Sequence, residues 1–347
     1  MSRARTKTMT KLKKLALATA SLVCASALIT TVAATATVAQ ATTNTSSATA
    51  KAANSVSVFS YNGSRQESTV SVPLNPTRVV AIDFAALDII DRLGAGQSVV
   101  GTPHGTAVPA YLKSYNDAKY KNIGTVKEVD MEAIMALEPQ VIFIGGRLAA
   151  KYDELSKIAP VVFLAVDYNQ PLLESVSRSA EVIGTIYNQK DQAKSIIASY
   201  QKRIQALKEA SAGKTVVLGM VNASQFKTLG DHGRCAMISH DLGFTNLAKD
   251  VDSTHGNESS FELLLKLNPD YVFILDRDSA IGRPGAQLAK DVMNNDLVNK
   301  TKAAQSGHIN YLNSAVWYLS EGGLTATDLM LQDLEQALHI AAPAKAK

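Results

Sequence analysis

Apolar residues recur along this chain in two alternating patterns. Short continuous apolar runs, each typical of a buried strand, occur in the first half at 78–82, 98–101, 141–144 and 161–166. Helical spacing follows the first run, in 85–94, and precedes the third, in 131–138. Strands that alternate with helices predict a parallel sheet covered by helices. The first half is therefore expected to form an α/β lobe.

Two further patterns flank this lobe. Residues 56–63 and 67–74 alternate between polar and apolar side chains around Asn62-Gly63, which predicts a hairpin. Residues 172–211 keep helical spacing without a flexible Gly/Pro/Ser linker. A helix therefore connects the two halves, which predicts a stiff hinge and only small movements between lobes.

The second half repeats the plan of the first. Its expected strands lie at 214–221, 270–275 and 308–312, and its expected helices include 260–269 and a closing amphipathic helix at 325–341. We read residues 222–233, between the first of these strands and the next helix, as a loop. The fold class predicted is α/β with two lobes, each a mostly parallel sheet with flanking helices, joined by one long helix.

One segment of each half matches the other at an offset of 130 residues. The matched pairs are Asp130 with Ser260, Glu132 with Glu262, Pro139 with Pro269, and Arg147 with Arg277. Caps, a proline and apolar spacing recur by chance in α/β proteins, but a matched Glu and Arg indicate an internal duplication. Because ligands bind outside the carboxyl ends of parallel strands, Arg147 and Arg277 are expected on opposite walls of one cleft.

A third arginine, Arg234, follows strand 214–221 and its loop, and it is expected to join the same cleft. Guanidinium groups suit anions with flat, delocalised oxygens. Two loops add metal donors, His255 and Tyr318. A phenolate is a hard donor that suits Fe³⁺, and an imidazole accepts many metals. Taken singly, a loop histidine is more often solvated and a "WYL" run more often packs against the core.

Composition and charge exclude several classes. With 46% apolar and 19% charged residues the chain is typical of a globular protein. Its formal charge of +4 arises in residues 1–41, which hold six basic residues and no acidic one; the remainder has 29 basic against 31 acidic residues. A nucleic-acid partner is therefore not expected. Phosphate-loop, nucleophile-elbow, zincin, dinucleotide and structural-zinc motifs are missing, so no enzyme activity is expected.

The basic tail has the parts of a secretory signal: a basic start, an uncharged apolar stretch and "AQA" at 39–41. An uncleaved anchor or a lipoprotein is the alternative, although "SLV" before Cys24 departs from a lipoprotein pattern. Cleavage leaves Cys235 as the one thiol, so no internal disulfide is expected. We predict a signal peptide at 1–41, a tether at 42–55, the first lobe at 56–169, a connecting helix at 170–190 and the second lobe at 191–347.

Residues 56–340 resemble the exported substrate-binding proteins of ABC-type iron-siderophore importers, most of all the subgroup that binds ferric catecholates such as petrobactin and enterobactin breakdown products. The resemblance is strongest in "THGNESSFELLLKLNPDYVFILDR", "NNDLVNKTKAAQSGHINYL" and "VWYLSEGGL". It implies a non-enzymatic, monomeric, periplasmic protein without a permanent cofactor. The match is looser in the first lobe than in the second, and His104 in "GTPHGTAVP" departs from the family, which usually has no histidine in this loop.

The resemblance also implies roles for individual residues. His255 and Tyr318 would coordinate Fe³⁺ left unsaturated by a tetradentate bis-catecholate, and Arg147, Arg234 and Arg277 would contact the catecholate oxygens. Glu132 and Glu262 would dock to arginines of the membrane permease, although acids in a first helical turn are also favoured by the helix dipole. Two alternatives remain open: a haem carrier with Tyr318 as axial ligand, and a secreted metal-dependent hydrolase that uses His255.

Overall fold

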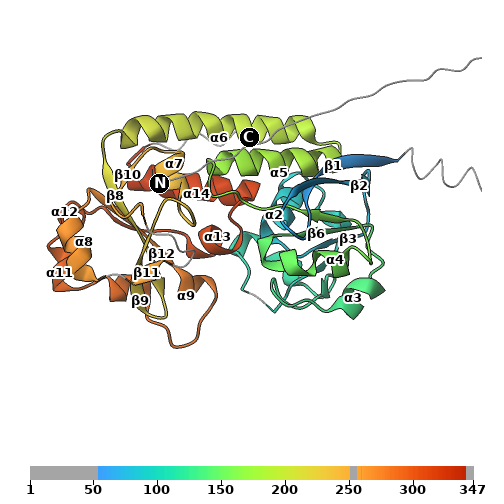
Figure 1. Ribbon diagram of the computed structural model, residues 1–347, viewed down its shortest axis with the longest axis horizontal. Helices are drawn as coiled ribbons and strands as arrows, with labels where there is room; N and C mark the ends of the chain where they lie inside the picture. The colour runs from blue at the N-terminus through green and yellow to red at the C-terminus, as the bar shows by residue number, and fades with distance from the viewer. Residues whose placement is uncertain (1–53, 106, 251–255, 259, 341–347) are drawn as a thin grey trace, which may run out of the picture. The chain divides into compact units, whose positions relative to one another are not determined.

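The two series of expected strands form two separate sheets in a computed structural model that describes residues 54–105, 107–250, 256–258 and 260–340 (Figure 1). All of these residues belong to one compact unit. The first sheet runs in the order β5-β4-β3-β6-β7, and each of its pairs is parallel. Its strands are β3 (Val79–Ala81), β4 (Val99–Thr102), β5 (Lys121–Asn122), β6 (Val141–Ile144) and β7 (Val161–Phe163). The parallel α/β lobe predicted for the first half is confirmed.

The expected hairpin precedes this sheet as β1 (Ser55–Tyr61) and β2 (Glu67–Pro73), paired antiparallel. Asn62 makes the turn, because its side-chain oxygen accepts hydrogen bonds from the backbone N–H groups of Ser64 and Gln66, both at 3.0 Å. The hairpin is fixed to the lobe through Ser60, whose hydroxyl accepts from the backbone N–H of Phe163 in β7 at 2.9 Å.

The second sheet is mixed rather than wholly parallel. Among the described residues its main path is β11-β9-β8-β12-β13, and β10 pairs with β8. Its strands are β8 (Thr215–Asn222), β9 (Gln225–Leu229), β10 (Thr245–Asn246), β11 (Asn257–Glu258), β12 (Tyr271–Asp276) and β13 (Ile309–Tyr311). Strands β10 and β12 both pair with β8 in parallel, and β13 pairs with β12 in parallel. Strand β9 is antiparallel to β8, and β11 is antiparallel to β9.

Strand β9 corrects the loop expected at 222–233. It forms a hairpin with β8 through Ala223 and Ser224, whose φ angles of 53° and 58° are both left-handed. Those angles suit the two-residue turns that match the twist of antiparallel strands, but such turns usually carry Asn or Gly. Ala-Ser is an unusual turn dipeptide, and the alternation of apolar and polar residues at Phe226 and Lys227 is short. The sequence therefore gave too weak a signal for a second strand after β8.

Two long helices, α5 (Leu172–Ile186) and α6 (Lys190–Ser211), lie side by side along one edge of the molecule (Figure 1). Helix α6 also packs on the closing helix α14 (Leu324–Ala337). The remaining helices of the first lobe are α2 (Phe84–Arg92), α3 (Met131–Ala136) and α4 (Tyr152–Leu155), with 3₁₀ turns η1 (Gly96–Ser98), η2 (Ala110–Asn116) and η3 (Gly146–Lys151). Those of the second lobe are α7 (Met237–His240), α8 (Phe261–Leu267), α9 (Arg277–Ala280), α10 (Ala289–Val292), α11 (Asp296–Asn299), α12 (Lys302–Gln305) and α13 (Ser314–Leu319). Two lobes, each with a mostly parallel sheet and flanking helices, and a helical connector confirm the predicted fold class.

The matched segments of the two halves adopt the same local structure. Asp130 caps α3 by accepting from the N–H of Ala133 at 2.9 Å, and Ser260 caps α8 by accepting from the N–H of Leu263 at 3.1 Å. Both helices end at a left-handed residue with φ 45°, Glu138 in the first and Asn268 in the second. The strands that follow, β6 and β12, are buried throughout. Equivalent segments therefore bring equivalent strand ends to the region between the lobes.

Each lobe also caps a helix that belongs to the other side. Asp241, just after α7, accepts from the backbone N–H groups of Leu172 at 2.9 Å and Leu173 at 3.3 Å, at the start of α5. Asp88 of α2 accepts from those of Thr325 at 2.8 Å and Ala326 at 2.7 Å, at the start of α14. Each carboxylate satisfies N–H groups that have no partner within their own helix. The lobes are thus tied together by hydrogen bonds in addition to the chain itself.

Candidate functional site

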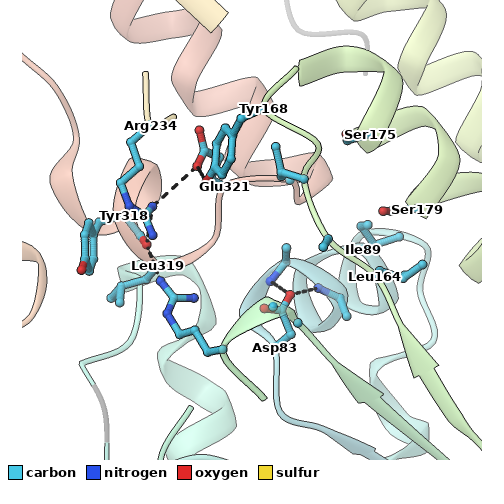
Figure 2. A pocket seen from close by; sticks show the side chains of 18 of the residues that line it. Asp83, Ile89, Leu164, Tyr168, Ser175, Ser179, Arg234, Tyr318, Leu319 and Glu321 are labelled. Atoms are coloured by element: carbon cyan, nitrogen blue, oxygen red, sulfur yellow. Dashed lines mark hydrogen bonds and ion pairs between the residues drawn. The ribbon is translucent and has the colours of Figure 1, made fainter. Parts of the chain in front are cut away.

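A pocket of about 430 Å³ lies between the two lobes (Figure 2). The first lobe contributes Asp83, after β3, Gly145 to Arg147, after β6, and Tyr168, after β7; helix α5 contributes Ser175 and Ser179. The second lobe contributes Arg234 and the segment from Tyr318 to Gly322. The pocket residues that follow β3 and β6 lie at the carboxyl ends of parallel strands, which is the position expected for ligand sites in α/β sheets.

The centre of the site is Tyr318, near the end of α13. Its side chain is 6% exposed, and the guanidinium carbons of Arg234, Arg277 and Arg147 lie 4.1, 5.5 and 5.9 Å from its ring centroid. Distances up to about 6 Å place a cation within reach of the ring's electron-rich face. The three arginines singled out in the sequence therefore come together around the one tyrosine that was singled out.

Hydrogen bonds fix this cluster at both ends of Tyr318. Its backbone carbonyl accepts from Arg147 Nη2 at 3.0 Å and from Arg234 Nη1 at 3.1 Å. Its hydroxyl oxygen accepts from Arg277 Nε at 2.9 Å, while Nη1 of Arg277 donates to Asn222 Oδ1 at 2.9 Å. The contact of Arg147 with Tyr318 joins the two lobes.

Helix α13 is held in place by Trp317, which is fully buried. Its indole N–H donates to Asp333 Oδ2 at 2.8 Å, and the same oxygen accepts from the N–H of Asn313 at 2.7 Å. Burial raises the pKa of Asp333, opposed by these two hydrogen bonds. The buried and hydrogen-bonded neighbour of Tyr318 in sequence thus helps to set its position.

Glu321 and Tyr168 are among the residues of the site that the sequence did not predict. The Glu321 side chain is 5% exposed; its Oε2 accepts from the Tyr168 hydroxyl at 2.7 Å and lies 3.6 Å from Arg234 Nη1 (Figure 2). Burial raises the pKa of Glu321, with Arg234 and the Tyr168 hydrogen bond opposing the rise. Burial and the charge of Glu321 raise the pKa of Tyr168. The only signal for Glu321 was its place in "WYLSEGG", three residues after Tyr318.

Arg234 is the most enclosed of the three arginines, with 8% exposure. Burial alone lowers its pKa, but Tyr168, Glu321 and Tyr318 oppose this and the net direction is upward. Its Nε atom is buried and has no hydrogen-bond partner within the described residues. A buried donor without a partner is costly, so this atom is available to an acceptor on a bound molecule.

Asp83 lines the first-lobe side of the pocket. One carboxylate oxygen caps α2 by accepting from the N–H groups of Ala85 at 3.0 Å and Ala86 at 3.1 Å. Burial raises the pKa of Asp83, and the charge of Arg147 opposes that rise. The other oxygen lies so close to Gly145 that a Cβ at position 145 would come within 2.2 Å of it. The glycine before Gly146-Arg147 thus permits the close approach of two strand ends.

Of the other predicted residues, His255 is outside the described residues. Glu132 and Glu262 are exposed in the first turns of α3 and α8. His104 lies within 3.2 Å of Thr102 Oγ1 and is absent from the pocket lining. Cys235 is buried, and burial raises the pKa of its thiol, which agrees with a packing role. Over the described part of the chain, no three His, Cys, Asp or Glu side chains gather as a metal site.

Comparison with known proteins gives consistent matches. The family of periplasmic binding proteins matches residues 79–316. Petrobactin-binding protein YclQ of Bacillus subtilis is 36% identical over 271 residues, which is 77% of this chain and 84% of YclQ. Ferric-anguibactin-binding protein FatB of Vibrio anguillarum is 26% identical over 268 residues, 75% of this chain and 81% of FatB.

Solved structures agree with these matches. The crystal structure of YclQ superposes with a TM-score of 0.76 at 33% identity and covers 82% of this chain and 100% of YclQ. The crystal structure of VctP, a periplasmic catecholate-siderophore binding protein of Vibrio cholerae, gives a TM-score of 0.75 at 29% identity and covers 81% of this chain and 100% of VctP.

Proposed function

This chain belongs to the periplasmic binding protein family, and on that basis we propose that it is the siderophore-binding component of an ABC-type iron importer, with a ferric catecholate as its ligand. Family membership makes it a binding protein rather than an enzyme, as the sequence predicted. YclQ is a petrobactin-binding protein and VctP a catecholate-siderophore binding protein, which supports a catecholate as the ligand class.

The observation that carries the proposal is the gathering of Arg147, Arg234 and Arg277 around Tyr318. Several guanidinium groups close to one another repel unless an anion joins them, so the site favours an anionic ligand. Two catecholates carry four negative charges against three on Fe³⁺. Arginine forks match the paired oxygens of a catecholate and donate charge-assisted hydrogen bonds.

Tyr318 and His255 would complete the coordination of the metal. A tetradentate bis-catecholate leaves two positions of a six-coordinate Fe³⁺ open, and a phenolate and an imidazole supply a hard and an adaptable donor. Arg277 Nε donates to the Tyr318 hydroxyl oxygen at 2.9 Å and so fixes the direction in which this donor points. Fe³⁺ enters here as part of the cargo and not as a resident cofactor.

Delivery to a permease would use the surface glutamates. Glu132 and Glu262 occupy equivalent positions on α3 and α8, one on each lobe, and both are exposed. Two anionic contacts on matched elements suit a membrane partner with two basic patches. We assign residues 1–41 as an export signal and 42–55 as a tether, which lie almost wholly outside the described residues. Within the described ranges, no helix is both long enough and apolar enough to cross a membrane.

A fluorescence titration tests the ligand class. Trp317 is the single tryptophan and adjoins Tyr318, so a bound iron chromophore quenches it. The mature protein is titrated with a ferric bis-catecholate, with haemin and with a hexadentate ferric tris-catecholate in parallel. We expect saturable quenching by the bis-catecholate, weakened at least about tenfold in Tyr318→Phe, which removes one metal donor. Quenching by haemin alone would favour a haem carrier instead, and the absence of binding by all three would overturn the proposal.

A further inference from the structure

Glu321 is a buried carboxylate placed among cations that the proposed ligand needs. Its Oε2 lies 3.6 Å from Arg234 Nη1, and the same Arg234 lies 4.1 Å from the Tyr318 ring centroid. Among the residues that line the pocket, the acidic ones are Asp83 and Glu321. Asp83 already caps α2 on the first-lobe side, whereas Glu321 faces the arginine cluster directly.

A carboxylate at this position weakens the binding of any anion, because it lies near the cations in a region from which water is largely excluded. Stability alone does not require a charged group here. A neutral amide of the same shape also accepts a hydrogen bond from Tyr168 and carries no desolvation cost of a buried charge. The charge of Glu321 therefore weakens anion binding, whereas a neutral amide could supply the same packing and hydrogen bond.

Tyr168 holds this carboxylate in place and comes from a different part of the chain. It lies between β7 and α5, in the segment that leads into the connector, and donates to Glu321 Oε2 at 2.7 Å. The hydrogen bond keeps Oε2 beside Arg234, so the negative charge stays on one side of the cluster. Arg234 Nε remains without a protein partner in the described structure, so this arginine still has a donor for the ligand.

We propose that Glu321 is a specificity-determining residue that limits the net positive charge around Tyr318, so that the site discriminates among ferric complexes by their charge. The proposal rests on the proposed function of the site. With Glu321 charged, the cluster of three arginines has its positive charge reduced by one, which suits a complex with about one negative charge that gains another from the Tyr318 phenolate. A more highly charged complex, such as a tris-catecholate with three negative charges, is disfavoured relative to a site that lacks Glu321.

The test compares two probes, a tetradentate ferric bis-catecholate and a hexadentate ferric tris-catecholate, by tryptophan quenching. The measured quantity is the ratio of their dissociation constants. In Glu321→Gln the ratio should shift toward the tris-catecholate by at least about tenfold, as expected for one buried unit charge acting on ligands that differ by two charges. Glu321→Asp keeps the charge and should retain a ratio near that of the wild type.

Further variants separate charge from packing. Arg234→Gln lowers the net positive charge of the cluster and should shift the ratio toward the bis-catecholate. This variant tests the proposal even where Glu321→Gln does not fold. The double variant restores the net charge and should bring the ratio back toward the wild type. Glu335→Gln is the matched control, because Glu335 is a buried glutamate paired with Arg203 through hydrogen bonds of 2.7 and 2.9 Å and lies outside the pocket lining; its ratio should not change.

Each outcome decides a different question. A shift in Glu321→Gln or Arg234→Gln in the stated direction, with none in Glu335→Gln, supports the charge-limiting role. An unchanged ratio in a folded Glu321→Gln variant overturns it and leaves the siderophore-binding function intact. The same shift in Glu335→Gln also overturns it, since loss of any buried ion pair would then suffice. Failure of the wild type to bind either probe overturns the proposed function itself.

Discussion

Asp88 in the first lobe accepts a hydrogen bond from the backbone N–H of Ala326 in the second, at 2.7 Å. The carboxylate is fully buried and also accepts from the N–H of Thr325 at 2.8 Å and from the Tyr111 hydroxyl at 2.8 Å. A residue of one lobe thus serves as the N-terminal cap of a helix in the other. The lobes are coupled at the base of the site through this contact and through Asp241 at the start of α5.

Replacing Asp88 by alanine should destabilise the whole described fold. The change removes the acceptor of two backbone N–H groups at the start of α14 and one of the two acceptors near the Tyr111 hydroxyl, and each buried donor left unpaired costs about 1–3 kcal/mol. We expect a loss of roughly 3 kcal/mol or more in the free energy of unfolding, measured in urea. Asp130→Ala is the matched control, since Asp130 caps α3 within its own lobe and is exposed; it should cost about 1 kcal/mol. Equal losses in the two variants would show that the contact between lobes adds nothing.

The stability contributed by Asp88 should depend on pH. Burial raises the pKa of Asp88 to about 6, opposed by its hydrogen bonds with Ala326, Thr325 and Tyr111. The folded state therefore binds the proton more tightly than the unfolded state. Relative to Asp88→Asn, the wild type should gain stability as the pH falls from 7 to 4, by up to roughly 3 kcal/mol. Urea unfolding of both proteins at several pH values measures this, and a constant difference would mean that the helix N-terminus keeps Asp88 charged.

His255→Ala should separate two classes of ligand. A tetradentate bis-catecholate needs protein donors to complete the coordination of Fe³⁺, whereas a hexadentate complex needs none. We expect the variant to weaken binding of the tetradentate complex about tenfold or more and to leave the hexadentate one within a factor of about three. Fluorescence titration gives both constants. His104→Ala is the control, because His104 is a histidine that does not line the pocket. Equal losses for the two ligands in His255→Ala would argue against direct coordination.

Charge reversal at the surface should affect delivery without affecting capture. Glu132→Lys and Glu262→Lys change exposed positions on α3 and α8 that are not among the residues lining the pocket. We expect an unchanged dissociation constant for the ferric complex and reduced iron uptake in cells that depend on this protein, most of all in the double variant. Glu128→Lys, an exposed glutamate of the first lobe before α3, is the control. Normal uptake by the double variant would remove the docking role.

Local patterns were enough to predict much of this molecule. Apolar runs bounded by caps and prolines predicted the strands and the helical connector, because burial and capping are properties of a few neighbouring residues. The offset of 130 residues predicted two equivalent lobes and singled out Arg147 and Arg277. The alternation in β9 was missed, because its turn uses Ala223 and Ser224 in left-handed conformations that their sequence does not favour.

The composition of the site was only partly predictable. Arg147, Arg234, Arg277 and Tyr318 were selected from the sequence, and they lie together. Glu321 and Tyr168 were not, because a glutamate next to two glycines has the same local pattern in a solvated loop as in a buried ion pair. Asp88 was equally hidden, since it lies in a helix of the first lobe and its partners are 237 and 238 residues away along the chain. The sequence by itself thus determined the elements and the cationic residues, whereas tertiary packing alone decided which buried carboxylates face those cations and which hold the lobes together, because burial and long-range contact are properties of the assembled chain.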